Sequence, residues 1–303
     1  MDRYGGVEAG GTKFVCMVGS GPEDISAEIR FPTTTPAETI GRAVDFFREQ
    51  LRSGPIRGVG IGSFGPLDLD PASPAYGFIT TTPKPGWADT DLIGPLRELL
   101  QAPVVIDTDV NTAALGEYLW GAAQGIQQFI YNTIGTGIGA GGIINGLPIH
   151  GMLHPETGHM RIPHDLEMDP FPGICPFHGD CFEGLASGVA LRERWGVPAE
   201  QLPVEAPAWD LQAHYIALAL VNQICMISPQ RVVLGGGVMK RAGLFPLVRR
   251  KVQRFLNGYV DRDEVKSEID RYIVPPVLGD RSGCLGAIGM AQHWAGDLGP
   301  GKQ

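Results

Sequence analysis

The stretch "GGVEAGGTKFVCMVGS", residues 5–20, and its counterpart "QQFIYNTIGTGIGAGGII", residues 127–144, decide the fold. In each stretch, two runs of apolar and β-branched residues flank a glycine turn, which is the pattern of a β-hairpin. The two turns lie roughly 125 residues apart, and an element that recurs in this way indicates a duplication. We therefore predict two halves of similar architecture, each presenting a glycine hairpin to a shared cleft.

The composition favours a soluble globular protein and excludes several classes. The chain has 303 residues, of which 43% are hydrophobic and 19% charged, so it can bury a substantial core. Its net charge is −9 with a pI near 5.3, and an acidic chain repels the phosphates of nucleic acids. No apolar run approaches the roughly 18 residues of a membrane span, and no signal peptide is visible. We expect a cytoplasmic protein with no nucleic-acid or membrane partner, in which Cys16, Cys225 and Cys284 are buried or incidental thiols.

The remaining pattern alternates between strands and helices, which indicates an α/β fold with mixed sheets. Apolar runs predict further strands at 24–33, 56–66, 102–110 and 230–239. Helical spacing predicts helices over 36–51, 88–101, 110–124 (ending at Gly125), 182–195, 209–228, 240–257 and 283–295.

Three glycine loops are candidates for binding phosphate. They occupy residues 9–13 ("AGGTK"), 135–141 ("GTGIGAG") and 234–238 ("LGGGV"). Without a Cβ in the way, backbone N–H groups in such loops can point at phosphate oxygens, although each loop could also be a simple tight turn. Neither a Walker A pattern nor a GxGxxG after the first strand occurs, so P-loop and Rossmann folds are disfavoured.

Seven ordered motifs resemble those of the ROK family of sugar kinases. They are "GVEAGGTKF", "GIGSFGPLD", "TDVNTAALGE", "NTIGTGIGAGGI", "HPETGHM", "CFEGLASG" and "VVLGGGV". The resemblance covers nearly the whole chain and points to the bacterial fructokinase/mannokinase branch, whose first motif also reads EAGGTKF. It implies the actin-like, hexokinase-like ATPase fold, with two ribonuclease-H-like lobes around a cleft. A small N-terminal lobe would span 1–116 and a large C-terminal lobe, with a zinc loop, 117–303. The helix at 283–295 is expected to pack back on the N-terminal lobe.

The same resemblance implies an ATP site formed by glycine loops from both lobes, with Mg²⁺ bridging the phosphates near Glu8. The residues implied to bind ATP are Gly10, Gly11, Thr12, Lys13, Gly135, Thr136, Gly137, Gly188, Gly235, Gly236 and Gly237.

For the acceptor side, the resemblance maps the catalytic base onto Asp109, which would take the proton of a sugar hydroxyl. An N-cap role for the helix at 110–124 is the alternative, and the two roles can coexist. Asp109, Gly65, Glu156 and Glu183 are implied to bind the sugar; the two glutamates could instead be solvated surface groups. Glucokinases of the family commonly differ at Glu8, Thr108 and Lys84, which argues against a glucose-specific site.

The stretch "CPFHGDC", residues 175–181, offers three zinc ligands within seven residues. From composition alone the fourth could be His150, His154, His159 or His164. The resemblance selects His159 and so implies a structural Zn²⁺ held by His159, Cys175, His178 and Cys181. Free thiols, or a disulfide between the two cysteines, are the alternatives.

Taken with the resemblance, the sequence predicts an ATP-dependent kinase that phosphorylates the 6-hydroxyl of a hexose, most readily D-fructose. Mannose, glucose and N-acetylhexosamines are the alternative substrates. A sugar-sensing regulator of the same family is the alternative of another class, but such regulators carry a helix-turn-helix domain ahead of the first glycine loop. Only five residues precede Gly6 here, so we expect none. The resemblance also implies a homodimer.

Overall fold

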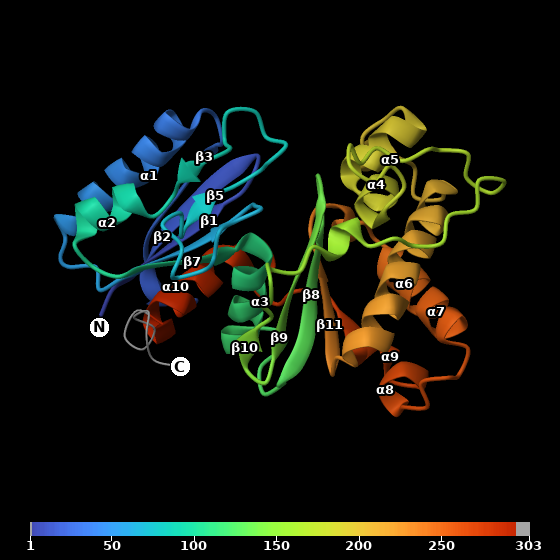
Figure 1. Ribbon diagram of the computed structural model, residues 1–303. Helices are drawn as coiled ribbons and strands as arrows, with labels where there is room; N and C mark the ends of the chain where they lie inside the picture. The colour runs from blue at the N-terminus through green and yellow to red at the C-terminus, as the bar shows by residue number, and fades with distance from the viewer. Residues whose placement is uncertain (1, 295–303) are drawn as a thin grey trace. The chain divides into compact units, whose positions relative to one another are not determined.

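The computed structural model describes residues 2–294, which form two compact units, each built on its own five-stranded sheet (Figure 1). The first unit contains residues 2–124, together with Pro148–His154 and residues 280–294. The second contains Gly125–Leu147 and Pro155–Gly279. The predicted lobe boundary at residue 116 stays a prediction. It lies inside helix α3 (Asp109–Trp120), all of which belongs to the first unit.

The sheet of the first unit has the strand order β3-β2-β1-β4-β7. Its antiparallel part is the predicted hairpin and third strand, and its parallel part joins β1 to β4 and β4 to β7. The strands are β1 (Tyr4–Ala9), β2 (Lys13–Gly21), β3 (Asp24–Pro32), β4 (Val59–Ser63) and β7 (Val104–Thr108).

One face of this sheet is covered by α1 (Pro36–Leu51) and α2 (Gly94–Leu100). Helix α1 begins where the sequence predicts, because the Thr35 side chain accepts a hydrogen bond from the Glu38 N–H and Pro36 lies at the first helical position. Helix α2 is six residues shorter at its start than the predicted helix over 88–101. There, residues Thr90–Asp91 form strand β6, and the Asp91 carboxylate accepts hydrogen bonds from the backbone of the next turn.

The other face is covered by α3 and α10 (Ser282–Trp294), and glycines set how closely these helices approach. A Cβ on Gly60 would lie 1.9 Å from the Ala287 carbonyl oxygen, and one on Gly62 would lie 2.0 Å from Thr112 Oγ1. Many glycines of the chain therefore serve helix-on-sheet packing rather than ligand binding. Helix α10 packs on the sheet of the first unit; residue 295 of the predicted helix over 283–295 lies outside the described residues.

The sheet of the second unit repeats the arrangement of the first, with the order β10-β9-β8-β11-β12. Strands β8 (Gln128–Ile134) and β9 (Ile138–Ile144) form the second predicted hairpin, and β11 (Arg231–Gly235) runs parallel to β8. In both sheets a hairpin and a third strand are followed by two parallel strands, which confirms the predicted duplication. The short strands are β10 (Leu147–Pro148) and β12 (Ile273–Val274).

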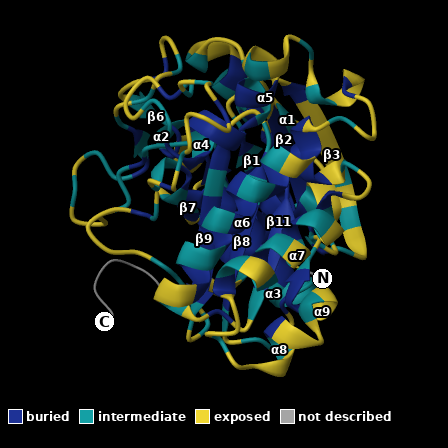
Figure 2. Cartoon of the chain, turned by 90° about the vertical axis from the view of Figure 1, so that its right-hand side faces the viewer, coloured by how far each residue is buried: buried dark blue, intermediate teal, exposed yellow. Residues whose placement is uncertain are grey.

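The core of the second unit lies between its sheet and α6 (Ala208–Ile227) with α7 (Leu244–Leu256) (Figure 2). Most of the apolar run at 215–227 is buried here, although Cys225 and Met226 are exposed. The predicted helix over 182–195 is two helices, α4 (Phe182–Ala186) and α5 (Gly188–Trp195), because Ser187 is extended and caps α5. The other elements are β5 (Phe78–Ile79), η1 (Thr157–His159), η2 (Ala199–Gln201), η3 (Val238–Lys240), α8 (Asp263–Lys266), α9 (Ile269–Tyr272) and η4 (Gly279–Arg281).

Within residues 2–294, no helix is both long enough and apolar enough to span a bilayer.

Candidate active site and metal centre

In the first unit, three predicted functional groups lie at the carboxyl ends of three neighbouring parallel strands. Ser63 at the end of β4 pairs with Ala9 of β1 on one side and with Thr108 of β7 on the other. The turn Gly10–Lys13 therefore follows β1, Gly65 follows β4, and Asp109 follows β7, all at one edge of the sheet. Ligands of open α/β sheets bind at this edge, so the topology gathers these residues where a site is expected.

The turn Gly10–Lys13 is held in place by hydrogen bonds from residues outside the hairpin. The Thr33 N–H donates to the Thr12 carbonyl at 2.9 Å, and the Thr33 hydroxyl donates to the Gly10 carbonyl at 2.7 Å. Lys84 Nζ donates to the Gly11 carbonyl at 2.6 Å, so a second cation besides Lys13 lies at the turn. Gly11, Thr12 and Lys13 are exposed, which leaves their backbone and side chains accessible to a phosphate.

Asp109 is the first residue of α3 and is not its N-cap. The N-cap is Thr108, whose hydroxyl accepts a hydrogen bond from Asn111 N–H at 3.1 Å, while Asp109 Oδ1 accepts from Val110 N–H at 2.9 Å. The predicted alternative role of Asp109 as N-cap is therefore wrong. The helix ends at Trp120 rather than at Gly125, with Gly121 as its C-cap. The strand also ends between Asp107 and Asp109, so Asp107 is fully buried under the sheet edge and Asp109 is mostly buried.

Burial makes both carboxylic acids of this edge weaker acids than usual. Desolvation raises the pKa of Asp109 to about 6, against the lowering by its backbone hydrogen bonds. Desolvation also raises the pKa of Glu8 to about 7; Lys13 lowers it and the charge of Asp109 raises it. A pKa near 6 suits a general base, because the carboxylate is ionised at neutral pH yet accepts a proton readily.

A pH profile tests this shift. Because the base must be ionised, we expect log(kcat/KM) for the sugar to fall by about one unit per pH unit as the pH drops below about 6. The measurement is steady-state turnover between pH 4.5 and 8.5, with coupling enzymes in excess. A profile that stays flat down to pH 4.5 would contradict a raised pKa at Asp109.

In the second unit, the predicted nucleotide glycines converge on the ends of β8 and β11. The Gly188 N–H donates to the Gly135 carbonyl at 2.7 Å, and a Cβ on Gly188 would lie 2.8 Å from that oxygen. Gly236 has a φ of +89°, and its Cβ position is 2.4 Å from the Ile134 carbonyl. Side chains at these positions would collide with backbone, so glycine is required for the loops to meet. The structure thus brings Gly135, Thr136, Gly137, Gly188, Gly235, Gly236 and Gly237 together.

The two predicted sugar-binding glutamates have different surroundings. Glu183 Oε2 accepts a hydrogen bond from Ile138 N–H at 2.9 Å, directly after the turn Gly135–Gly137, so one carboxylate oxygen holds the glycine turn. Glu156 is exposed, and its carbonyl accepts from His159 N–H at 3.0 Å at the start of η1. A Cβ on Gly158 would lie 2.0 Å from the Ile138 carbonyl, so η1 packs tightly against the start of β9.

Four side chains between residues 159 and 181 form a cluster that fits a tetrahedral metal. The ligand atoms of His159, Cys175, His178 and Cys181 all lie within 4.8 Å of one another. Cys175 Sγ is 3.6 Å from Nδ1 of both histidines, and Cys181 Sγ is 3.8 Å from His159 Nδ1. A tetrahedral zinc with ordinary bond lengths separates sulfur and nitrogen ligands by about 3.6 Å. The other histidines left open by composition lie outside this cluster, and both cysteines are free thiols.

The segment 159–181 that carries this cluster is also anchored by a buried ionic network that the sequence did not predict. Asp169 accepts from Tyr215 Oη at 2.6 Å and pairs with Arg194 Nη2 at 3.1 Å. His164 Nδ1 lies 3.2 Å from Asp180 Oδ2, and His164 Nε2 lies 3.0 Å from the Asp169 carbonyl oxygen. Asp169 and Arg194 are only 4% and 7% exposed, so each charge depends on the other.

Breaking this pair should destabilise the second unit. We expect Asp169→Asn to lower its stability by about 3–5 kcal/mol, because Arg194 is left buried without a counter-ion. Arg192→Met on the same helix is the matched control: it removes an exposed pair with Glu193 and should change stability by less than about 0.5 kcal/mol. Thermal melting followed by circular dichroism measures both. Equal melting temperatures for the two variants would argue against a structural role for the network.

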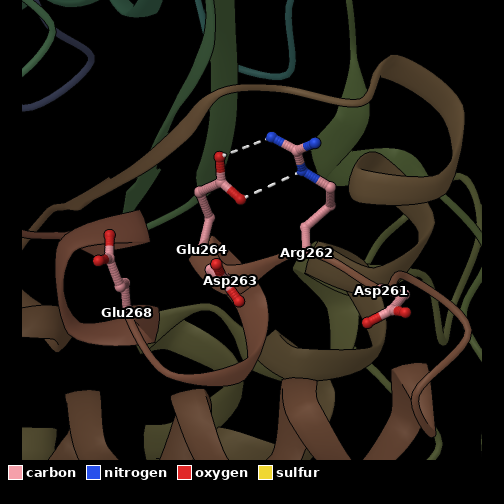
Figure 3. Close-up of a pocket in the computed structure, with 5 residues that line it drawn as sticks. All are labelled: Asp261, Arg262, Asp263, Glu264 and Glu268. Carbon is pink, nitrogen blue, oxygen red and sulfur yellow. Dashed lines mark hydrogen bonds and ion pairs between the residues drawn. The ribbon is translucent and has the colours of Figure 1, made fainter.

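None of the predicted site residues lines the acidic hollow at α8 (Figure 3). Its lining is mostly exposed, and Arg262 is paired with Glu264 at 3.2 Å. The hollow is lined by Asp261, Arg262, Asp263, Glu264 and Glu268.

The arrangement can be compared with known proteins. The sequence profile of the ROK family matches residues 4–293. The fructokinase of Zymomonas mobilis is 45% identical over 293 residues, covering 95% of this chain and 96% of that protein. The crystal structure of the ROK hexokinase from Thermus thermophilus superposes with a TM-score of 0.80 and is 26% identical, covering 98% of this chain and 100% of that one.

A ROK family glucokinase from Streptomyces griseus, crystallised with glucose and AMPPNP, has a TM-score of 0.74 and 25% identity, covering 96% of this chain and 99% of that one. The two repeated sheets, the glycine loops at their strand ends and these matches agree along nearly the whole sequence. The fold is the actin-like ATPase fold, and the chain belongs to the ROK family.

Proposed function

We propose that this protein is an ATP-dependent hexose kinase that converts D-fructose to fructose 6-phosphate. The observation that carries the proposal is Asp109, a carboxylate with a raised pKa at the same sheet edge as Gly10–Lys13 and Gly65. The 45% identity to a fructokinase supports fructose, and the glucokinase crystallised with AMPPNP supports a nucleoside triphosphate as donor.

The proposed reaction is a direct transfer. Asp109 accepts the proton of the sugar 6-hydroxyl, the hydroxyl oxygen bonds to the γ-phosphorus, and the bond from that phosphorus to the β–γ bridging oxygen breaks to release ADP. The N–H groups of the exposed turn Gly10–Lys13 and the cations of Lys13 and Lys84 would neutralise phosphate charge. Mg²⁺, when bound, would offset further phosphate charge. Glu8 suits a place near it, because a cation would favour its ionised form.

The zinc loop has a supporting role in this proposal. With four protein ligands, a zinc ion at His159, Cys175, His178 and Cys181 has no position open to water, so it would be structural. The cluster lies in the chain between Glu156 and Glu183, and η1 packs against the glycine turn that Glu183 holds. We propose that zinc fixes these two glutamates for sugar binding.

We also propose that the protein works as a cytoplasmic homodimer.

The identity of the sugar is tested by ADP release. Purified protein with MgATP is assayed against fructose, mannose, glucose, N-acetylglucosamine and N-acetylmannosamine, and we expect the highest kcat/KM with fructose. A preference for another hexose would change the proposed substrate, but the proposed kinase function would stand. No sugar-dependent ADP release with any of them would overturn the proposed function, and specific sugar binding without turnover would favour a sensor.

A further inference from the structure

Two histidines that the zinc cluster does not use lie on one short segment, Pro148–His154, which packs with the first unit. His154 is buried, and its Nε2 accepts a hydrogen bond from Leu67 N–H at 3.2 Å. A Cβ on Gly65 would lie 3.3 Å from the same nitrogen. His150 Nε2 lies 2.9 Å from Asp107 Oδ2. Because β4 and β7 are neighbours, the segment contacts the chain at the carboxyl ends of both strands, near Gly65 through His154 and at Asp107 through His150.

Asp107 connects His150 to the turn that carries Asp109. Its Oδ1 accepts hydrogen bonds from Thr108 N–H at 2.7 Å and from Asn111 Nδ2 at 2.9 Å, and its side chain is 2% exposed. These contacts fix the backbone where β7 ends and α3 begins. Asp109, the first residue of α3, follows Asp107 by two residues. The other oxygen faces His150, so the imidazole completes the environment of a buried carboxylate.

The His150 ring is only partly used by this contact. Its side chain is 44% exposed, and among residues 2–294 the structure shows no hydrogen-bond partner for Nδ1. Asp107 is the charged group placed against the ring, and their hydrogen bond raises the pKa of His150. In the imidazolium form both nitrogens carry protons, so Nε2–H donates to Asp107 and Nδ1–H is left to donate to a ligand.

We propose that His150 is a substrate-binding residue that donates Nδ1–H to a hydroxyl oxygen of the acceptor sugar beside Asp109. This rests on the proposed hexose kinase function. A hydroxyl fits better than an ATP phosphate, because β7 and the phosphate turn after β1 are separated by β4, a distance of about 10 Å at ordinary strand spacing. The segment thus supplies a donor at the end of the sheet edge away from the phosphates.

Kinetics of two His150 variants test the proposal. His150→Ala should raise KM for fructose about 10- to 100-fold, the usual effect of losing a hydrogen bond from a charged donor, with KM for ATP unchanged. His150→Gln is a second variant whose amide can still pair with Asp107 but carries no charge, and it should raise KM for fructose in the same direction. His293→Gln, an exposed histidine on α10, is the matched control and should behave as wild type.

Imidazole NMR gives a readout that a purely structural residue would not move. In ¹⁵N-histidine-labelled protein, with His150 assigned from the Gln variant, fructose should shift the His150 Nδ1 resonance, whereas ATP alone should not. Unchanged KM for fructose, a rise in KM for ATP instead, or no Nδ1 shift would each overturn the role of His150. If the wild-type protein phosphorylates no hexose, the proposed kinase function fails as well. This outcome is distinct from a failure of the His150 role alone, in which the wild-type protein still phosphorylates a hexose.

Discussion

Asp109→Asn is expected to lower kcat by between about 10² and 10⁴-fold, the usual range for loss of a general base. The amide has almost the same shape and its oxygen can still accept the hydrogen bond from Val110 N–H, so α3 should begin unchanged. An amide cannot take the proton of the sugar hydroxyl, so the loss should appear in kcat, while KM for ATP stays near its wild-type value.

Asp45→Asn is the matched control for this variant. Asp45 is an exposed carboxylate on α1 paired with Arg48, and its replacement should leave kcat unchanged. Circular dichroism and the melting temperature check that both variants are folded. A value of kcat in Asp109→Asn above a tenth of the wild-type value would contradict the assignment of Asp109 as the base.

Cys175→Ala is expected to abolish the proposed zinc site and to impair sugar use by about 10²-fold in kcat/KM for fructose. Cys175 contacts both histidines of the cluster, and its loss leaves three ligands where a structural zinc needs four. Glu156 precedes His159 by three residues in the chain, so a loosened loop misplaces a sugar contact, and a misplacement of about 1 Å can cost this much. The melting temperature should fall too, because metal binding contributes to folding.

Two further variants make this test specific. His178→Cys exchanges one zinc ligand for another and so keeps a four-ligand site; it should retain one zinc per chain by elemental analysis, with kinetics near wild type. Cys225→Ser removes an exposed thiol outside the cluster and should change neither zinc content nor kinetics. Unchanged fructose kinetics in Cys175→Ala protein verified to be free of zinc would contradict the proposed role of the metal.

The sequence predicted the parts of the site that depend on local pattern. Both glycine hairpins formed where alternating apolar runs flank the turns, and α1 began at its Thr35 cap. The split between α4 and α5 had a signal that was missed, because Ser187 before Gly188 is a helix-capping residue inside an apolar run. The late start of α2 depended on Asp91, whose carboxylate satisfies the backbone of its own turn.

Other features depend on contacts between distant segments and could not be predicted from one sequence. Gly60 and Gly62 look the same in the sequence as the glycines of the turns predicted to bind phosphate, but they allow α10 and α3 to pack closely on the sheet. Likewise, nothing in the chain near His150 identifies Asp107 as its partner, 43 residues earlier. The pairing of Asp169 with Arg194 depends in the same way on the folded packing of the zinc loop against α5 and α6.

The central claim is transfer of the γ-phosphoryl group of ATP to the 6-hydroxyl of fructose with Asp109 as base. It is tested most directly by ³¹P and ¹³C NMR of the products formed from fructose and MgATP by wild-type and Asp109→Asn protein. The account predicts fructose 6-phosphate and ADP in equal amounts with wild type, and almost none with the variant. A phosphate on any other fructose hydroxyl, ADP without sugar phosphate, or equal product from both proteins would contradict it.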